Sequence, residues 1–244
     1  MELGEYGMKP YLLRLVACLF LCVSLNSFGA LYDRGNGLIY DDVLNITWLQ
    51  NANYAFTSGY SIANAVGEVE ASQVNIQADG RMGWEAATTW VNQLTYADYN
   101  NWRLPSANLM NSSNPCEAND GSCDFGYNNT TAEVGHMFYN NLNNVALTPI
   151  LTNISFTDSS SGLIKSFINV KSDKYWYQDN LESNSAEDAW SFDASDGDNS
   201  DDAKVDSSYA WAVHDGDIGA SPVPLPASFW LFASGLISLR LFRL

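Results

Sequence analysis

The chain has 244 residues, of which 11 are Lys or Arg and 28 are Asp or Glu, so its formal net charge is −17. This acidic balance argues against a nucleic-acid partner, which needs a basic surface to displace counterions, and against electrostatic docking on anionic lipid. A hydrophobic fraction of 46% excludes a disordered acidic tail, because it supplies enough apolar surface for a core.

The N-terminus has the three parts of an export signal. A short basic stretch begins at Met8, an apolar stretch covers residues 15–25, and Ser27 and Gly29 place small residues before a cleavage point. The apolar stretch is shorter than the roughly 20 residues of a membrane span. We therefore expect signal peptidase to remove residues 1–29, with Met8 as an alternative start. The other interpretation is a buried helix of the folded domain.

The first elements of the mature chain are a hairpin and a helix. Residues 37–50 alternate apolar and polar side chains around a turn at Asp41 and Asp42, which predicts two paired strands. Residues 51–80 are polar and predict a loop. A helix is expected over residues 83–94. Its apolar stripe is formed by Trp84, Ala87, Val91 and Leu94.

The cysteines fit an exported chain. Cys18 and Cys22 leave with the signal, so only Cys116 and Cys123 remain, in a segment rich in turn residues. An even pair in such a loop is most simply a disulfide. A metal-binding pair is the alternative, although no other cysteine is left to complete it.

A second helix and several short strands follow. Thr130 and Glu133 have the spacing of a capping box at a helix start. The apolar stripe of that helix is Val134, Met137, Phe138 and Leu142. Aromatic segments predict strands at 155–156, 174–177, 188–192 and 209–213. The order predicts an α+β domain with two helices beside antiparallel sheet.

The acidic run 193–202 offers oxygen ligands that calcium prefers. The candidate ligands are Asp196, Asp198, Asp201 and Asp202. The run does not follow the EF-hand order, and a solvated turn between strands is the alternative. Calcium is the only cofactor that the sequence suggests.

Catalytic patterns are missing from the sequence. It contains no Gly-x-Ser-x-Gly elbow, no His-Glu-x-x-His helix and no phosphate-binding glycine loop. Its two histidines, His136 and His214, are expected to be packed or strand-end residues, although His214 beside Asp215 would form a pH-sensitive pair. The tryptophans are expected mainly in the core, with stacking on sugars as the alternative. We therefore expect no enzyme.

The last 23 residues, 222–244, combine a proline cluster, an apolar stretch and a basic end. The motif residues are Val223, Pro224, Leu225, Pro226 and Ala227, followed by Arg240 and Arg243. This segment resembles the PEP-CTERM sorting signal in its Val-Pro-Leu-Pro-Ala form. The resemblance implies transient insertion in the inner membrane as a short helix and cleavage by an exosortase. The basic end is sparser than in that family, and a simple membrane anchor is the alternative.

Eight segments of the mature chain occur in the order of one bacterial domain family. They are 37–41, 46–50, 83–87, 102–106, 133–139, 175–176, 189–192 and 209–213. Over residues 36–217 the chain resembles the family related to the C-terminal domain of the Lcl collagen-like adhesin. Its most specific residues here are Trp102, Arg103, Leu104 and Pro105, with Trp190 and Trp211. His214 departs from the pattern, because family members usually have Arg after Ala-Val.

The resemblance implies a C-type-lectin-like fold over residues 31–221 and a role in adhesion or polysaccharide binding. Arg103 is expected to form a structural ion pair or a backbone contact, with contact to a ligand as the alternative. The expected protein is a precursor anchored in the inner membrane of a Gram-negative-type bacterium, sorted to the cell surface or the extracellular matrix. The alternatives are a coat or biofilm-matrix component without a specific ligand, and a secreted hydrolase.

Overall fold

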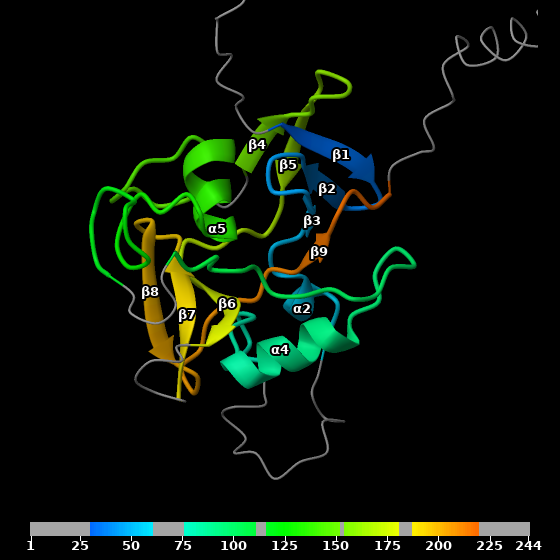
Figure 1. Ribbon diagram of the computed structural model, residues 1–244. Coiled ribbons are helices and arrows are strands. Elements are labelled where there is room, and N and C mark those ends of the chain that lie inside the picture. Colours follow the sequence, from blue (N-terminus) through cyan, green and yellow to red (C-terminus); the bar gives the residue numbers. More distant parts are fainter. Residues whose placement is uncertain (1–29, 61–75, 111–115, 152–153, 181–186, 220–244) are drawn as a thin grey trace, which may run out of the picture.

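The computed structural model describes residues 30–60, 76–110, 116–151, 154–180 and 187–219 (Figure 1). The predicted signal peptide and sorting tail, with Val223 to Ala227, Arg240 and Arg243, lie outside the described residues. Within the described ranges, no helix is long and apolar enough to cross a membrane.

The first sheet joins the beginning of the domain to its end. Its strands are β1 (Leu31–Gly35), β2 (Leu38–Asp41), β3 (Ile46–Leu49) and β9 (Val213–Asp215), in that spatial order and all antiparallel. The predicted hairpin is confirmed as β2 and β3. β1 was missed, and of the strand predicted at 209–213 only Val213 belongs to β9.

Two smaller sheets complete the β structure. One pairs β4 (Ile154–Thr157) with β5 (Ile164–Phe167). The other has the order β6 (Lys174–Asn180), β7 (Asp188–Asp193) and β8 (Asp198–Ala203). The strands predicted at 155–156, 174–177 and 188–192 are confirmed, whereas β5 and β8 were missed. β7 is buried on both faces, including Ser191, so its apolar-polar alternation does not mark a solvent face.

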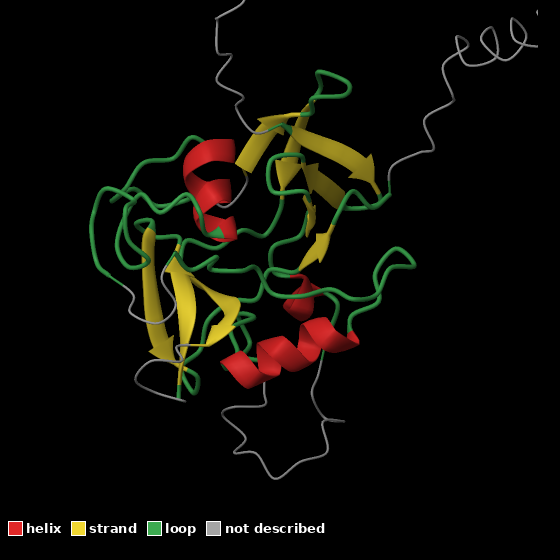
Figure 2. Cartoon of the chain, in the orientation of Figure 1, coloured by secondary structure: helices red, strands yellow, loops and turns green. Residues whose placement is uncertain are grey.

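The helices are short except for one. α4 (Trp84–Gln93) confirms the helix predicted over 83–94, and it lies at the opposite side of the molecule from β1 (Figures 1 and 2). α2 (Tyr54–Thr57) forms where a loop was expected, because its single turn buries Ala55 in the core. α5 (Glu133–His136) continues into a π-helix, η1 (Met137–Asn141), and confirms the second helix. The chain therefore combines a few helices with antiparallel sheets.

The capping box predicted at the start of α5 is wrong. The cap position is Ala132, and no side chain caps the helix by a hydrogen bond. Instead, the Asn129 Oδ1 accepts hydrogen bonds from the backbone N–H groups of Thr131 and Ala132 at 3.0 and 3.1 Å. The Glu133 carboxylate is engaged by other donors, as described below.

Trp211 lies where the three sheets meet. Its ring contacts Trp48 of β3, Phe167 of β5 and Tyr175 of β6, with centroid distances of 4.8, 5.2 and 5.8 Å. Its Nε1 donates a hydrogen bond of 2.7 Å to the Leu49 carbonyl oxygen. All seven tryptophans between residues 31 and 221 are buried, which confirms their prediction as core residues. Every residue of the described core cluster lies between Leu31 and Val213.

Candidate functional site

Arg103 connects three distant parts of the chain. Its guanidinium donates to both carboxylate oxygens of Glu133 at 2.8 Å, in the two-bond geometry that gives strong pairs. It also donates to Asp215 Oδ1 from Nη2 and Nε, at 2.7 and 2.9 Å. A further bond reaches the Leu104 carbonyl oxygen at 3.0 Å. The predicted structural role of Arg103 is therefore confirmed by its contacts.

The acidic groups around Arg103 stabilise its positive charge. Burial alone would lower the pKa of Arg103, but the hydrogen bonds and negative charges of Glu133 and Asp215 raise it above its usual value. Only 7% of the Glu133 side chain is exposed, and its Oε2 also accepts from the backbone N–H of Ser106 at 2.7 Å. Arg103 is thus satisfied by protein groups.

The other motif residues also pack inside the domain. Leu104 and Pro105 are buried, and the Pro105 carbonyl accepts from the Gln178 backbone N–H at 2.8 Å. Trp102 donates from Nε1 to the Tyr99 carbonyl at 3.1 Å. Trp190 lies against Phe125 with ring centroids 4.2 Å apart. The motif therefore builds the core of the domain.

The two histidines have no common site. His136 is buried, and its Nδ1 lies 2.9 Å from Asn140 Nδ2. His214 lies in β9 with its ring against Tyr99 and Trp102. Its Nδ1 faces the backbone carbonyl of Asp215, while the Asp215 carboxylate is held by Arg103. The predicted packed and strand-end roles agree with these contacts.

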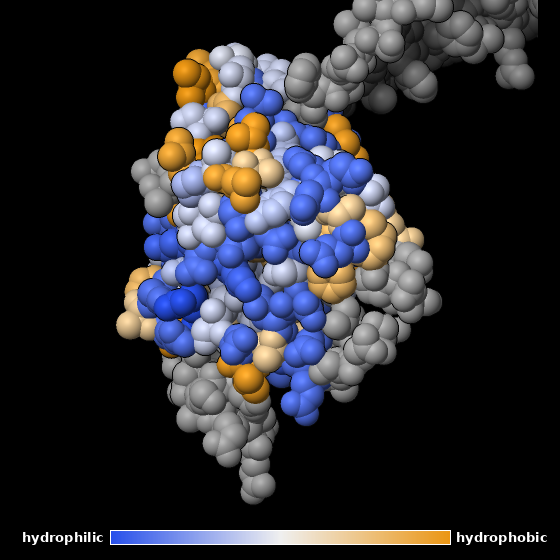
Figure 3. All heavy atoms as spheres, turned by 90° about the vertical axis from the view of Figure 1, so that its left-hand side faces the viewer, coloured by the Kyte–Doolittle hydropathy of each residue, from blue (hydrophilic) through white to orange (hydrophobic). Residues whose placement is uncertain are grey.

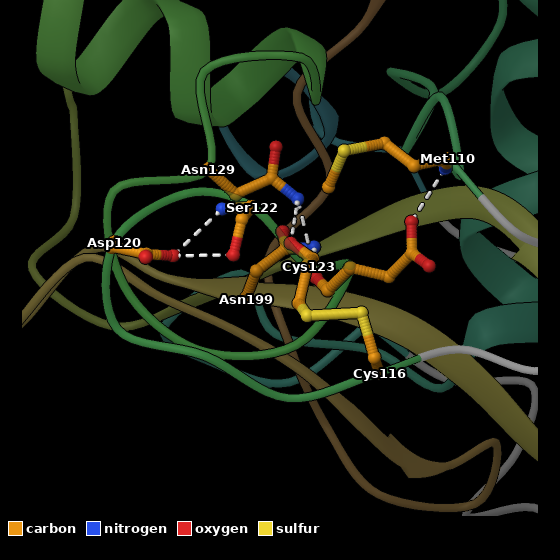
Figure 4. Close-up of a disulfide and its surroundings, with 8 residues drawn as sticks. Met110, Cys116, Asp120, Ser122, Cys123, Asn129 and Asn199 are labelled. Atoms are coloured by element: carbon orange, nitrogen blue, oxygen red, sulfur yellow. Dashed lines mark hydrogen bonds between the residues drawn. A yellow bond between two sulfur atoms is a disulfide. The ribbon is translucent and has the colours of Figure 1, made fainter.

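Cys116 and Cys123 form the predicted disulfide, with Cα atoms 5.0 Å apart (Figure 4). Both sulfurs are therefore used, and the alternative of a metal-binding pair is excluded. The loop is fixed to the domain beside Cys123. Asn129 Nδ2 donates to the Cys123 carbonyl at 3.2 Å, and Asn199 Nδ2 donates to the Asp124 carbonyl at 2.6 Å. The disulfide thus closes the loop on itself, and the hydrogen bond from Asn199 ties the loop to β8.

The acidic run 193–202 is a hairpin and not a single loop. Asp196 lies in the turn, whereas Asp198, Asp201 and Asp202 belong to β8. Strand pleating directs Asp201 and Asp202 to opposite faces, and Asp202 is engaged by Lys174 Nζ at 2.5 Å. Among the described residues, no group of three or more His, Cys, Asp or Glu side chains could hold a metal ion. Strand pairing thus separates the four candidate ligands between a turn and a strand. Calcium binding by this run stays a prediction. The surface on this side is largely hydrophilic with separate apolar spots (Figure 3).

Asp198 is the most perturbed carboxyl group of this hairpin. The pKa of Asp198 is raised to about 6 from an ordinary 3.8, chiefly by burial and further by the negative charges of Asp196 and Asp193, against the opposing effect of Lys174. A raised pKa means that the folded state binds the proton more tightly than the unfolded state. The ionised form is therefore unfavourable in the folded chain above about pH 6, and stability increases as the pH falls from about 6 towards 4.

We expect Asp198→Asn to raise the melting temperature at pH 7.5 and to have little effect at pH 4. The gain is on the order of 1 kcal/mol, because solvent screens a partly exposed side chain, and this corresponds to roughly 2–4 °C. Thermal unfolding at both pH values measures it. Asp206→Asn is the matched control, since Asp206 is exposed in the turn after β8. Equal effects of the two changes at pH 7.5 would contradict the assignment to the Asp198 environment.

A pocket of about 260 Å³ opens beside α4, between its C-terminal end and α2. Its walls include Tyr54 and Tyr60 with Ser58, Gln93 and Thr95, and the buried Trp90 also lines it. The Tyr60 hydroxyl donates to Gln93 Oε1 at 3.1 Å, and the Tyr54 ring is braced edge-on by Tyr96 at 4.9 Å. Burial raises the pKa of Tyr60 above its ordinary value of 10.0.

Sequence reasoning missed this pocket. Tyr54, Ser58 and Tyr60 belong to the range that was interpreted as a loop, and they meet Gln93 only through the fold. The two tyrosines in a polar segment were the only local signal. Comparisons of the chain with protein-family models, with curated proteins and with solved structures gave no match.

Proposed function

We propose that this chain is an exported surface or matrix protein whose C-type-lectin-like domain binds polysaccharide without catalysis. Signal peptidase removes its N-terminal segment, and an exosortase processes the tail at the inner membrane. The support is the resemblance of the tail and of residues 36–217, together with the α and β elements, the disulfide and the pocket described above.

The arrangement of the two ends carries the proposal. β1 begins at Leu31, and the last described residues pack against the same sheet, where Arg34 and Asp217 form an ion pair of 2.6 Å. The Gly219 N–H also donates to the Tyr99 hydroxyl at 3.1 Å. Both ends of the described domain leave from the side of β1, whereas α4 lies on the other side (Figure 1). A domain held through its C-terminal tail would therefore present α4 away from the membrane, and the pocket opens between α4 and α2.

The sorting part is tested by changing the prolines of the tail. Pro224→Ala together with Pro226→Ala is expected to leave an unprocessed chain in the inner membrane of an exosortase-containing host. Pro222→Ala is the matched control, because it lies outside the Val-Pro-Leu-Pro-Ala motif, and it should be processed normally. Fractionation and the mass of the mature chain measure the outcome. Unchanged processing of the double variant, or processing in a host without exosortase, would refute this assignment.

The binding part is tested with the purified chain and a panel of neutral and acidic polysaccharides, with calcium and with a chelator. Saturable binding that a soluble oligosaccharide competes away is the expected result. Loss of binding in chelator would assign calcium to the acidic hairpin. A folded chain that binds no member of the panel would favour the alternative of a coat component. Turnover of a polysaccharide that disappears with one acidic residue would favour the hydrolase.

A further inference from the structure

The pocket beside α4 differs in charge from the molecule around it. Residues 31–221 contain seven basic and 26 acidic residues, which gives a net charge of −19. The seven described residues that line the pocket are uncharged. The field of the domain repels anionic ligands, and none of these described residues is a cation that could hold one. A ligand with a carboxylate or sulfate group is therefore unfavourable here.

The lining groups match the two kinds of surface that a sugar ring presents. The tyrosine rings of Tyr54 and Tyr60 offer apolar faces for the C–H face of a pyranose. The side chains of Ser58, Gln93 and Thr95 offer hydroxyl and amide groups for its hydroxyls. Because Gln93 Oε1 accepts from Tyr60, its amide plane is oriented before a ligand arrives. The Tyr54 ring is likewise held by Tyr96.

The size of the pocket limits what can enter. Its volume of about 260 Å³ lies just below the range of roughly 300–1,000 Å³ for sites that enclose drug-sized ligands. One ring of a polymer fits such a space, with the neighbouring rings left outside. A few convergent polar groups in an aromatic pocket are the usual composition of small-molecule sites.

We infer that the pocket formed by Tyr54, Ser58, Tyr60, Trp90, Gln93 and Thr95 binds a single uncharged sugar residue of a polysaccharide. This inference rests on the proposed function and specifies its site and its ligand class. Uronic-acid and sulfated polysaccharides are excluded as ligands of this pocket.

The test is calorimetric titration of the purified full-length chain with neutral and with uronic-acid oligosaccharides. Ser58→Trp is expected to fill the pocket and to weaken binding of the neutral oligosaccharide at least tenfold. Gln93→Ala, which removes an exposed side chain, should weaken it several-fold. Asn92→Trp and Asn92→Ala are matched controls, because Asn92 is an exposed neighbour on α4 outside the pocket. Both controls should bind as the unchanged chain does, and far-ultraviolet circular dichroism checks that each variant is folded.

The outcomes separate this inference from the proposed function. Neutral-sugar binding that Ser58→Trp and Gln93→Ala reduce, with the Asn92 variants unaffected, supports both. Neutral-sugar binding that Ser58→Trp leaves intact refutes the pocket but keeps the function. Binding of uronic-acid oligosaccharides alone refutes the ligand class. A folded chain that binds neither kind refutes the inference and the proposed polysaccharide binding together.

Discussion

Replacing Arg103 by alanine is expected to lower the free energy of unfolding by about 3–5 kcal/mol, because breaking a buried pair leaves an uncompensated charge. Glu133 would keep its carboxylate in a site where 7% of its side chain is exposed. The connection between β9 and the segment after Trp102 would also lose the bonds to Asp215. Urea unfolding followed by tryptophan fluorescence measures the change.

Two further variants test whether the stabilisation by Arg103 depends on the geometry of its hydrogen bonds or on its positive charge alone. Arg103→Lys keeps the charge but cannot donate to both oxygens of Glu133 and to Asp215 at once, so we expect an intermediate loss. Arg81→Ala removes an exposed pair with Asp79 and should cost only about 0–1 kcal/mol. If Arg81→Ala and Arg103→Ala had equal effects, the network around Arg103 would not be the structural element described here.

Trp211→Ala is the second change with a large expected effect, a loss of about 3–5 kcal/mol, as found for large-to-small changes of buried aromatic residues. The cavity would open where β3, β5 and β6 approach one another, between Trp48, Phe167 and Tyr175. The Leu49 carbonyl would also lose its donor. Chemical unfolding measures the loss, and the near-ultraviolet circular dichroism of the folded state should weaken.

Trp211→Phe is the matched variant for this site. It keeps an aromatic ring in the cluster but removes the Nε1 donor and part of the volume, so its loss should be clearly smaller. A loss of unfolding free energy below about 1 kcal/mol for Trp211→Ala would contradict a central role of Trp211 in the core. It would mean that the three sheets close the cavity with little loss of stability.

The elements that could be predicted are those with strong local patterns. The hairpin of β2 and β3 and the helix α4 follow from alternating or helically spaced apolar residues. β8 could not be found in this way, because its sequence Asp-Asn-Ser-Asp-Asp-Ala has low strand propensity. It becomes a strand because its whole length pairs with the buried strand β7.

The Arg103 network and the pocket beside α4 were also beyond the reach of local sequence patterns. The Trp-Arg-Leu-Pro segment pointed to Arg103, but the partners of Arg103 lie 30 and 112 residues further along the chain, so only the fold reveals them. Asp215 directly follows His214, and the structure gives Asp215 a role as an acceptor for Arg103. The pocket beside α4 is likewise non-local, since its tyrosines and Gln93 come from separate segments.

The pairing of β9 with β3 determines when the domain can finish folding. Trp48 in β3 pairs with Val213 in β9, and Arg103 obtains Asp215 from the same strand. Under the proposed export, a chain that is translocated from its N-terminus has β1 to β8 outside before β9 arrives. The sheet and the ion-pair network are therefore completed only by residues just ahead of the C-terminal segment. Contacts of such long sequence separation form slowly, so the pairing of β9 with β3 is expected to be a late step of folding.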